Sequence, residues 1–330
     1  MRFVDAPKRF AEIDALKGAG ILTVVLIHSL RDAWDPWISP GELWLKVVTR
    51  FAVPAFLLCS GFLYATTSPV PAATVAQRLR RVLVPYLVAS AAAQIMWAAH
   101  GSAHDAPTVA RELLLGSSFG PYYYVFVHFF LVLCVPLFAI LPRALFALLT
   151  AVFLVSQGYL ESGMAPVVPS FWYWRNPLLW WGYFLVGWLV RLHYDKIRRL
   201  VSERRGVLSA GLAIAVVVFT GVASGEPRAG LVRGAIWLDI YAILGLLFVF
   251  QCGRGRSPRW VRSLADAAFA IYLIHLFFVY GAQSVVRATS QSFVPVVIFV
   301  YWSAGVVGAL AVIGLARVLL GPRSRDIVGA

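Results

Sequence analysis

The chain has 330 residues, of which 60% are hydrophobic and only 13% are charged. Soluble domains carry about a quarter charged residues, so this composition excludes a soluble globular protein and indicates a chain that crosses a membrane several times. The formal net charge of +14 does not indicate nucleic-acid binding, because the basic residues lie in short clusters between apolar runs. The three cysteines lack the spacing of metal ligands.

Ten apolar runs are long enough to cross a bilayer, for which about 20 residues are needed. They are residues 18–35, 44–66, 82–99, 122–141, 144–160, 177–193, 207–224, 231–251, 265–285 and 294–320. With this count, 21 of the 29 Lys and Arg residues fall on one side, which predicts that both termini are cytoplasmic. We therefore expect an all-α, polytopic integral membrane protein with one transmembrane domain over residues 1–330 and no separate soluble domain.

Two ionisable residues are of interest in the first predicted helix, Lys17 at the start of the run and His28 in its apolar part. Eleven residues advance a helix by three turns and about 20°, so the two side chains share one face, roughly 16 Å apart along the axis. Lys17 is either a snorkelling anchor, which Asp14 could pair with, or a cation that receives a phosphate or carbonyl group. His28 is costly at this depth and titrates in the range that suits proton transfer, so we favour a functional role for it.

The second and third runs add further candidates. Arg50 lies at a depth similar to that of His28 and could stabilise a developing oxyanion, or it could be an ordinary interfacial residue. Pro54 is expected to bend the second helix, and Ser60-Gly61 permits close approach of another helix. Two arginines that share a face precede the third run, where they either mark the cytoplasmic side and contact lipid or grip an anionic cofactor such as a nucleotide phosphate. They are Arg78 and Arg81.

Late in the chain, Tyr272 and His275 lie three residues apart in the middle of the ninth run and share a helix face. This second buried histidine is a further candidate for proton transfer or hydrogen bonding. Asp239, central to the eighth run, is the deepest carboxylate and could pair with a cation or face a water-filled cavity. The chain contains neither the glycine-rich phosphate loop nor the zinc-binding HExxH motif of soluble enzymes.

Together these residues resemble the acyltransferase-3 family of integral membrane acyltransferases over nearly the whole chain. The family's pattern of a basic residue, ten residues and a histidine is similar to Lys17 through His28. Its other motifs resemble Pro54–Phe62 (Pro-x-Phe…Ser-Gly-Phe), Arg78–Arg81 (Arg-x-x-Arg), Phe184–Gly187 (Phe-Leu-x-Gly) and Tyr272–His275 (Tyr-Leu-x-His). The chain departs from the family in two places. Lys17 replaces the usual arginine, keeping the charge but losing the bidentate fork, and Tyr123-Tyr124 replaces a Trp-Tyr or Trp-Phe pair.

The resemblance implies an enzyme that moves an acyl group, with acetyl favoured, from cytoplasmic acyl-coenzyme A to a hydroxyl of a carbohydrate or glycolipid. His28 would act as a general base or as a transient acyl carrier. The resemblance implies no metal, a bacterial inner membrane as the location, and membrane lipid but no nucleic acid as a partner. The residues it assigns to catalysis are His28, His275, Tyr272 and Arg50, and those it assigns to donor binding are Lys17, Arg78, Arg81 and Ser60.

Two functions of other classes stay open on the sequence. A transporter or flippase for a glycolipid or polysaccharide unit would use the same polar interior without covalent chemistry. A structural subunit of an envelope-assembly complex would tolerate the loss of both His28 and His275. Within the enzyme interpretation, succinyl transfer and a small secondary metabolite as acceptor also stay open.

Overall fold

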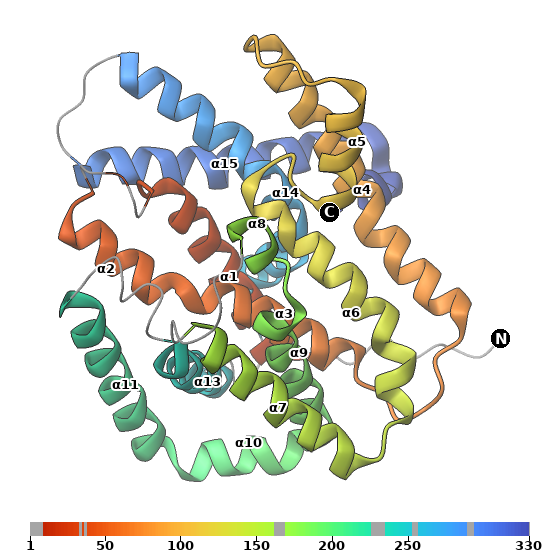
Figure 1. Cartoon of the computed structure of the whole chain (residues 1–330), viewed down its shortest axis with the longest axis vertical. Helices are drawn as coiled ribbons and strands as arrows, with labels where there is room; N and C mark the ends of the chain where they lie inside the picture. Colours follow the sequence, from red (N-terminus) through yellow and green to blue (C-terminus); the bar gives the residue numbers. More distant parts are fainter. Residues whose placement is uncertain are drawn as a thin grey trace.

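The computed structural model describes residues 9–32, 35, 38–161, 169–225, 235–252, 257–288 and 294–329. Every regular element in these residues is helical, which confirms the predicted all-α class (Figure 1). The elements are α1 (Ala11–Ser29), α2 (Pro40–Val48), η1 (Thr49–Phe51), α3 (Ala52–Tyr64), α4 (Ala72–Ala99), α5 (Ala106–Leu115), η2 (Gly120–Tyr122), α6 (Tyr123–Ile140), α7 (Arg143–Glu161), α8 (Ser170–Tyr173), α9 (Pro177–Leu192), α10 (Tyr194–Glu203), α11 (Arg205–Gly225), α13 (Ala235–Cys252), α14 (Arg259–Ala288), α15 (Val294–Leu320), η3 (Gly321–Arg323) and α16 (Ser324–Ile327).

Six helical segments of the described chain are long and apolar enough to cross a membrane. They are Pro40–Tyr64, Ala72–Ala99, Gly120–Ile140, Arg143–Leu160, Arg259–Val286 and Val294–Ile327. Their outward side chains are apolar, and Ile95, Leu148 and Val318 are 71%, 60% and 81% exposed. Such extensive apolar surface is stable in lipid rather than in water. The chain is therefore a multi-pass membrane protein, whereas the count of ten spans and the side of the termini stay predictions.

Each of the ten predicted runs overlaps a helix, but the first helix begins and ends earlier than predicted. We expected residues 18–35, whereas α1 covers Ala11–Ser29. The acidic residues Glu12 and Asp14 lie in its first turn, where carboxylates stabilise the positive end of the helix dipole. The helix thus extends beyond the apolar run, and Lys17 lies inside its second turn.

The second predicted run is interrupted by a tightened turn. The 3-10 turn η1 separates α2 from α3, and Pro54 is the third residue of α3. Proline has no amide hydrogen to donate to the carbonyl four residues before it, here that of Arg50. The distortion predicted at Pro54 therefore takes the form of a local 3-10 turn just ahead of it, and this turn carries Arg50.

Helices α3 and α9 touch through their backbones. A β-carbon at Gly61 would overlap the carbonyl oxygen of Phe184, and one at Gly187 would overlap that of Leu58. Small residues at such positions let membrane helices approach closely. The close approach predicted at Ser60-Gly61 is therefore confirmed, and its partner is the Phe-Leu-x-Gly motif of α9.

Helix α1 lies inside the bundle. It packs against α3, α13, α14 and α15 (Figure 1), and its side chains Ile21, Val24 and Val25 are buried in the same apolar cluster as Ile271. The indole nitrogen of Trp302 on α15 donates a 3.0 Å hydrogen bond to the carbonyl of Leu22. Lys17 and His28 are therefore carried by a helix that lies in the interior rather than in lipid.

Residues 100–121 lie between the third and fourth predicted runs and form more than a simple surface loop. They contain α5, and the residues that follow it turn into the bundle, where Phe119 and Tyr122 are buried. The Tyr122 hydroxyl donates a 2.6 Å hydrogen bond to the carbonyl of Leu273 in the middle of α14. Arg175 donates to the carbonyl oxygens of Leu115 (2.7 Å) and Gly116 (3.0 Å). The segment is inserted because burial of its aromatic rings outweighs the cost of satisfying a few backbone groups.

Candidate active site

Two histidines from helices far apart in the sequence meet in the interior. The rings of His28 on α1 and His275 on α14 have centroids 5.4 Å apart and planes inclined by 39°. His275 is fully buried, whereas His28 is partly exposed to a cavity described below. The structure thus brings together the two histidines that the sequence placed on separate spans.

The hydrogen bonds of His275 define which of its nitrogens carries the proton. Its Nδ1 lies 3.0 Å from the carbonyl oxygen of Ile271 and 2.8 Å from that of Tyr272. Carbonyl oxygens only accept, so Nδ1 is the donor and Nε2 keeps its lone pair. Within the described residues, Nε2 is buried and has no hydrogen-bond partner. His275 therefore holds a nitrogen lone pair in the interior that can accept a hydrogen bond.

The hydroxyl of Tyr272 is already engaged. It donates a hydrogen bond to the carbonyl oxygen of Pro121, in the inserted segment before α6. Tyr272 could polarise a substrate carbonyl only if its hydroxyl released Pro121 and donated to the substrate instead. In the structure, the bond and the one from Tyr122 to Leu273 together fix the inserted segment against α14.

A row of rings links the histidine pair to the start of α4. The successive centroid distances are 6.4 Å for His275–Tyr272, 5.6 Å for Tyr272–Tyr124, 5.7 Å for Tyr124–His128 and 5.8 Å for His128–Tyr64. The Tyr64 hydroxyl also lies 3.3 Å from Nε2 of His128. At the end of the row, the Arg78 guanidinium carbon lies 4.5 Å from the centre of the Tyr64 ring, a cation–π contact. Helices α14, α6, α3 and α4 each contribute to this row.

Sequence reasoning did not include Tyr64 and His128 in the site. His128 is 5% exposed, and its Nδ1 has no partner within the described part of the chain. The spacing of Tyr124 and His128, four residues apart on α6, is the signal that could have shown them to share a face. Tyr64 gives no such signal, because it is the last residue of α3 and is brought to His128 only by packing.

Arg78 and Arg81 converge on Tyr64, as their shared helix face predicts. Both lie close enough to the Tyr64 ring to interact with it electrostatically. Arg78 is partly buried, and its Nη1 has no hydrogen-bond partner among the described residues, whereas Arg81 is exposed. Buried guanidinium nitrogens are normally hydrogen-bonded, so Arg78 has an unused donor directed into the protein.

Lys17 lies at the opposite end of α1 from the cavity. Its neighbours are Cys59, Asp14 and Asp266, yet it forms no ion pair within the described residues. The alternative that Asp14 pairs with Lys17 is not what the structure shows, because Asp14 pairs with Arg9 at 2.7 Å. The partly buried ammonium group of Lys17 is thus available for an anionic ligand.

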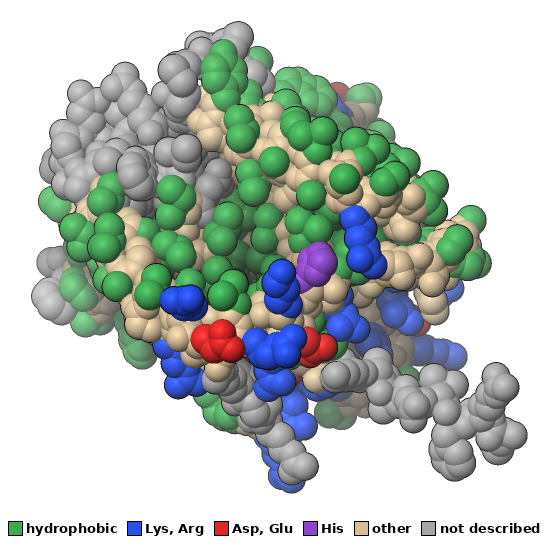
Figure 2. All heavy atoms as spheres, turned by 90° about the horizontal axis from the view of Figure 1, so that it is seen from below, with side chains coloured by type: hydrophobic (Ala, Val, Ile, Leu, Met, Phe, Trp, Pro, Cys, Tyr) green, Lys and Arg blue, Asp and Glu red, His purple; other side chains and the backbone are tan. Residues whose placement is uncertain are grey.

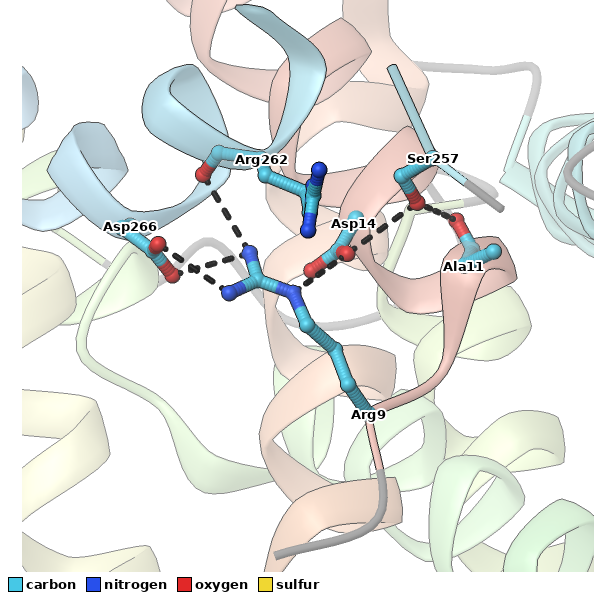
Figure 3. Close-up of polar contacts among 6 residues, drawn as sticks. All are labelled: Arg9, Ala11, Asp14, Ser257, Arg262 and Asp266. Carbon is cyan, nitrogen blue, oxygen red and sulfur yellow. Dashed lines mark hydrogen bonds and ion pairs between the residues drawn. The ribbon is translucent and has the colours of Figure 1, made fainter. Parts of the chain in front are cut away.

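A network centred on Arg9 holds this end of α1 to α14 (Figure 3). Arg9 binds Asp14 through Nε and reaches both oxygens of Asp266 with its two terminal nitrogens, at 3.1 and 3.2 Å. Ser257 donates a 3.1 Å hydrogen bond to the same Asp14 carboxylate. The hydrogen bond that Arg9 donates to Asp14 and the negative charges of both carboxylates raise the pKa of Arg9 further above its usual value, so the guanidinium keeps its charge at any physiological pH.

Helix α10 brings more basic residues to the same end of the molecule. Arg198 lies 3.5 Å from the Glu12 carboxylate of α1, and the Tyr194 hydroxyl donates to it at 3.1 Å. Burial, together with the charge of Glu12, raises the pKa of Tyr194 to about 12, so it stays a neutral donor. Figure 2, viewed from the α10 end, shows Lys and Arg side chains gathered along the lower part of the face and hydrophobic side chains above them.

The remaining predicted residues lie on α3 and its neighbour η1. Ser60 is beside Tyr124 and so borders the row of rings. Arg50 interacts electrostatically with Tyr123 at the start of α6, and its position at the depth of His28 stays a prediction. The side chain of Asp239 lies outside the described residues.

A cavity of about 630 Å³ opens at the C-terminal end of α1, and His28 forms part of its wall. The side formed by the end of α1, the residues after it and α2 is mainly polar. The other, from α14 and α15, is largely apolar or aromatic. The lining residues are Ile27, His28, Ser29, Leu30, Arg31, Asp32, Asp35, Glu42, Lys46, Tyr280, Gln283, Val286, Val294, Val297, Ile298 and Tyr301. Across the part of the chain that the structure describes, no group of three or more His, Cys, Asp or Glu side chains could hold a metal ion.

Residues 10–318 match the family model described as an acyltransferase domain, that of the acyltransferase-3 family. No curated protein and no solved structure matches the chain. The family match covers nearly the entire sequence, including every motif that the resemblance was based on. The chain is therefore a membrane-embedded member of the acyltransferase-3 family.

Proposed function

We propose that the protein transfers an acyl group, acetyl in the first instance, from acyl-coenzyme A to a hydroxyl group of a carbohydrate or glycolipid. The observation that carries this proposal is the His28–His275 pair, in which one ring lines a cavity and the other has a buried nitrogen without a partner among the described residues. A hydroxyl is a poor nucleophile until a base takes its proton, and this pair supplies such a base next to open space.

The donor is expected at the end of α1 that carries Lys17. Coenzyme A has several phosphate groups, and the cations proposed to bind them are Lys17, which has no ion pair in the described chain, and Arg78 and Arg81 beside Tyr64. Arginine and lysine are the usual partners of phosphate. An extended pantetheine arm could cover the roughly 16 Å from Lys17 to His28 along α1.

In the proposed reaction, Nε2 or Nδ1 of His28 takes the proton of the acceptor hydroxyl as its oxygen attacks the thioester carbonyl. The carbon–sulfur bond then breaks, and the coenzyme A thiolate recovers the proton from His28. Alternatively, His28 attacks first and carries the acyl group to the hydroxyl; the products are the same. In either route, His275 is a positioning residue. Its Nε2 lone pair accepts a hydrogen bond from the His28 ring when that ring becomes positively charged.

The carbonyl oxygen gains negative charge in this step, and Arg50 and Tyr272 are the candidates for stabilising it. The hydroxyl of Tyr272 is committed to Pro121, which favours Arg50 for this role and a positioning role for Tyr272. Ser60, beside Tyr124, would contact the donor along the row of rings.

We place the Lys17 end of the molecule in the cytoplasm of a bacterium, with the protein in its inner membrane. The concentration of Lys and Arg at this end supports that orientation. Acyl-coenzyme A is a cytoplasmic donor, so this orientation also puts the cationic residues on the side from which the donor would enter.

The test is transfer of label from radioactive acetyl-coenzyme A in membranes that contain equal amounts of wild-type protein, His28→Ala, His275→Ala or His193→Ala. His193 is an exposed histidine between α9 and α10 and serves as the matched control. We expect label in lipid-linked or glycan material with the wild type and His193→Ala. Removing a general base costs about 10² to 10⁴ in rate, so His28→Ala should show essentially none.

Equal labelling by wild type and His28→Ala would refute the proposed role of His28. Movement of a glycolipid across the membrane without acylation, unchanged in His28→Ala, would instead favour the transporter interpretation. A reduced but measurable rate in His275→Ala, with an altered pH profile, is what a positioning role for His275 predicts.

A further inference from the structure

The cavity at the C-terminal end of α1 has two chemically different walls, and this division identifies the kind of acceptor it fits. We propose that it binds an amphiphile, a neutral sugar head group joined to an apolar tail, and that the acceptor is therefore lipid-linked rather than a water-soluble glycan. This inference rests on the proposed acyl transfer, which it extends by naming the acceptor class.

The polar wall carries charges of both signs close together. Arg31 lies 3.8 Å from the buried carboxylate of Glu42, and Lys46 interacts electrostatically with both Asp32 and Glu42. Glu42 is also fixed by hydrogen bonds from the backbone nitrogen and the hydroxyl of Ser39, each 2.9 Å long. An anionic head group would meet the carboxylates and a cationic one would meet Arg31 and Lys46. A neutral polyol, which both donates and accepts hydrogen bonds, suits such a wall.

The side formed by α14 and α15 is apolar over Val286, Val294, Val297 and Ile298, although these helices also contribute Tyr280, Gln283 and Tyr301 to the lining. On α15, the residues directly beside these face outward, and Val296, Phe299 and Val300 are 54%, 64% and 40% exposed. In a membrane this outward face contacts lipid tails. A tail lying on the apolar wall could therefore continue into the bilayer along α15 without exposing its methylene groups to water.

The catalytic histidine lies within the same cavity. His28 is part of its wall, and the volume of about 630 Å³ is within the range of sites for small organic ligands, about 300–1,000 Å³. A head group against the polar wall would place hydroxyl groups beside His28 while the tail occupies the α14–α15 side. Both halves of the cavity are thus accounted for by one ligand.

A matched pair of acceptors tests this inference. Purified full-length protein in lipid nanodiscs receives radioactive acetyl-coenzyme A with either methyl β-glucoside or octyl β-glucoside, which share one sugar ring and differ in the tail. We expect kcat/KM for octyl β-glucoside to be at least tenfold higher. Equal values, or a preference for the methyl glucoside, would overturn the proposal.

A matched pair of variants locates the tail. Val297→Thr places a hydroxyl on the apolar wall, whereas Val296→Thr makes the same change on the lipid-facing side of α15. We expect Val297→Thr to raise KM for octyl β-glucoside at least threefold, with KM for acetyl-coenzyme A and for methyl β-glucoside unchanged, and Val296→Thr to change none of them. Equal effects of Val297→Thr on both glucosides would contradict the assignment of this wall to the tail.

Occupancy can also be read without chemistry. In Val297→Cys and Val296→Cys proteins, the rate of maleimide labelling is measured with each glucoside and compared with the background of wild-type protein. We expect octyl β-glucoside, but not methyl β-glucoside, to slow labelling at position 297 and not at 296. Protection at both positions, or at neither, would overturn the acceptor inference. Protection at 297 alone without any acetyl transfer would uphold the cavity and instead refute the proposed function.

Discussion

The contact between α3 and α9 gives a prediction whose sign can be worked out from the structure. In a helix interior, replacing glycine with alanine normally stabilises by about 0.5–1 kcal/mol, because glycine loses more conformational freedom on folding. At Gly61, however, the added methyl group would overlap the backbone carbonyl of Phe184. A backbone oxygen cannot rotate away as a side chain can, so α3 and α9 would have to separate.

Overpacking a well-packed interior typically costs about 1–3 kcal/mol. The Gly61→Ala change should reach the upper end of that range, about 3 kcal/mol, because separation also weakens the second close contact, between Gly187 and Leu58. The control is Gly211→Ala on α11, where the new methyl group would lie 3.7 Å from Leu244, an ordinary contact. We expect Gly211→Ala to be neutral or slightly stabilising.

The assay is equilibrium unfolding in mixed micelles, followed by tryptophan fluorescence, for wild type, Gly61→Ala, Gly187→Ala and Gly211→Ala. Tryptophans report on this contact because Trp188 on α9 is buried in the same cluster as Phe184. The reasoning would be refuted if Gly61→Ala unfolded at the same denaturant concentration as Gly211→Ala. It would also fail if Gly187→Ala were as stable as the wild type.

Three further predictions concern polar residues. Lys17→Met should raise KM for acetyl-coenzyme A about tenfold, because one charge-assisted contact is lost. Lys17→Arg should retain most of the affinity. If initial-rate measurements show an unchanged KM for Lys17→Met, Lys17 does not bind the donor. Arg9→Met should lower the free energy of unfolding by about 1–2 kcal/mol, less than for a fully buried pair because the Arg9 side chain is 43% exposed. Asp266→Asn should lower it by less, because the Asp266 side chain is 55% exposed. A larger loss for Asp266→Asn than for Arg9→Met in the same unfolding assay would contradict this order. Tyr272→Phe should lower the free energy of unfolding by about 1 kcal/mol, because the hydrogen bond to Pro121 is lost. It should lower kcat less than tenfold. A hundredfold fall in kcat would mean that the Tyr272 hydroxyl stabilises the transition state directly.

Some features of the site could be predicted from local sequence alone. Lys17 and His28 share a face because the pitch of a helix is fixed, and α1 does contain both residues. The pairs Tyr272–His275 and Arg78–Arg81 follow from the same periodicity. The predicted boundary of α1 is wrong because an apolar run marks only part of the helix, whereas the acidic first turn is stabilised by the helix dipole and by the ion pair with Arg9.

The chain's composition and apolar runs by themselves determined that it is helical and membrane-embedded, because an uninterrupted apolar segment in lipid must satisfy its backbone hydrogen bonds internally. Only the tertiary structure decided that His28 meets His275, that Tyr64 reaches His128, and that the residues after α5 enter the bundle. These contacts join helices distant in the sequence, and they depend on how side-chain shapes and small residues such as Gly61 fit together. Periodicity specifies which face of a helix is buried, but it contains no information on which other helix will cover that face.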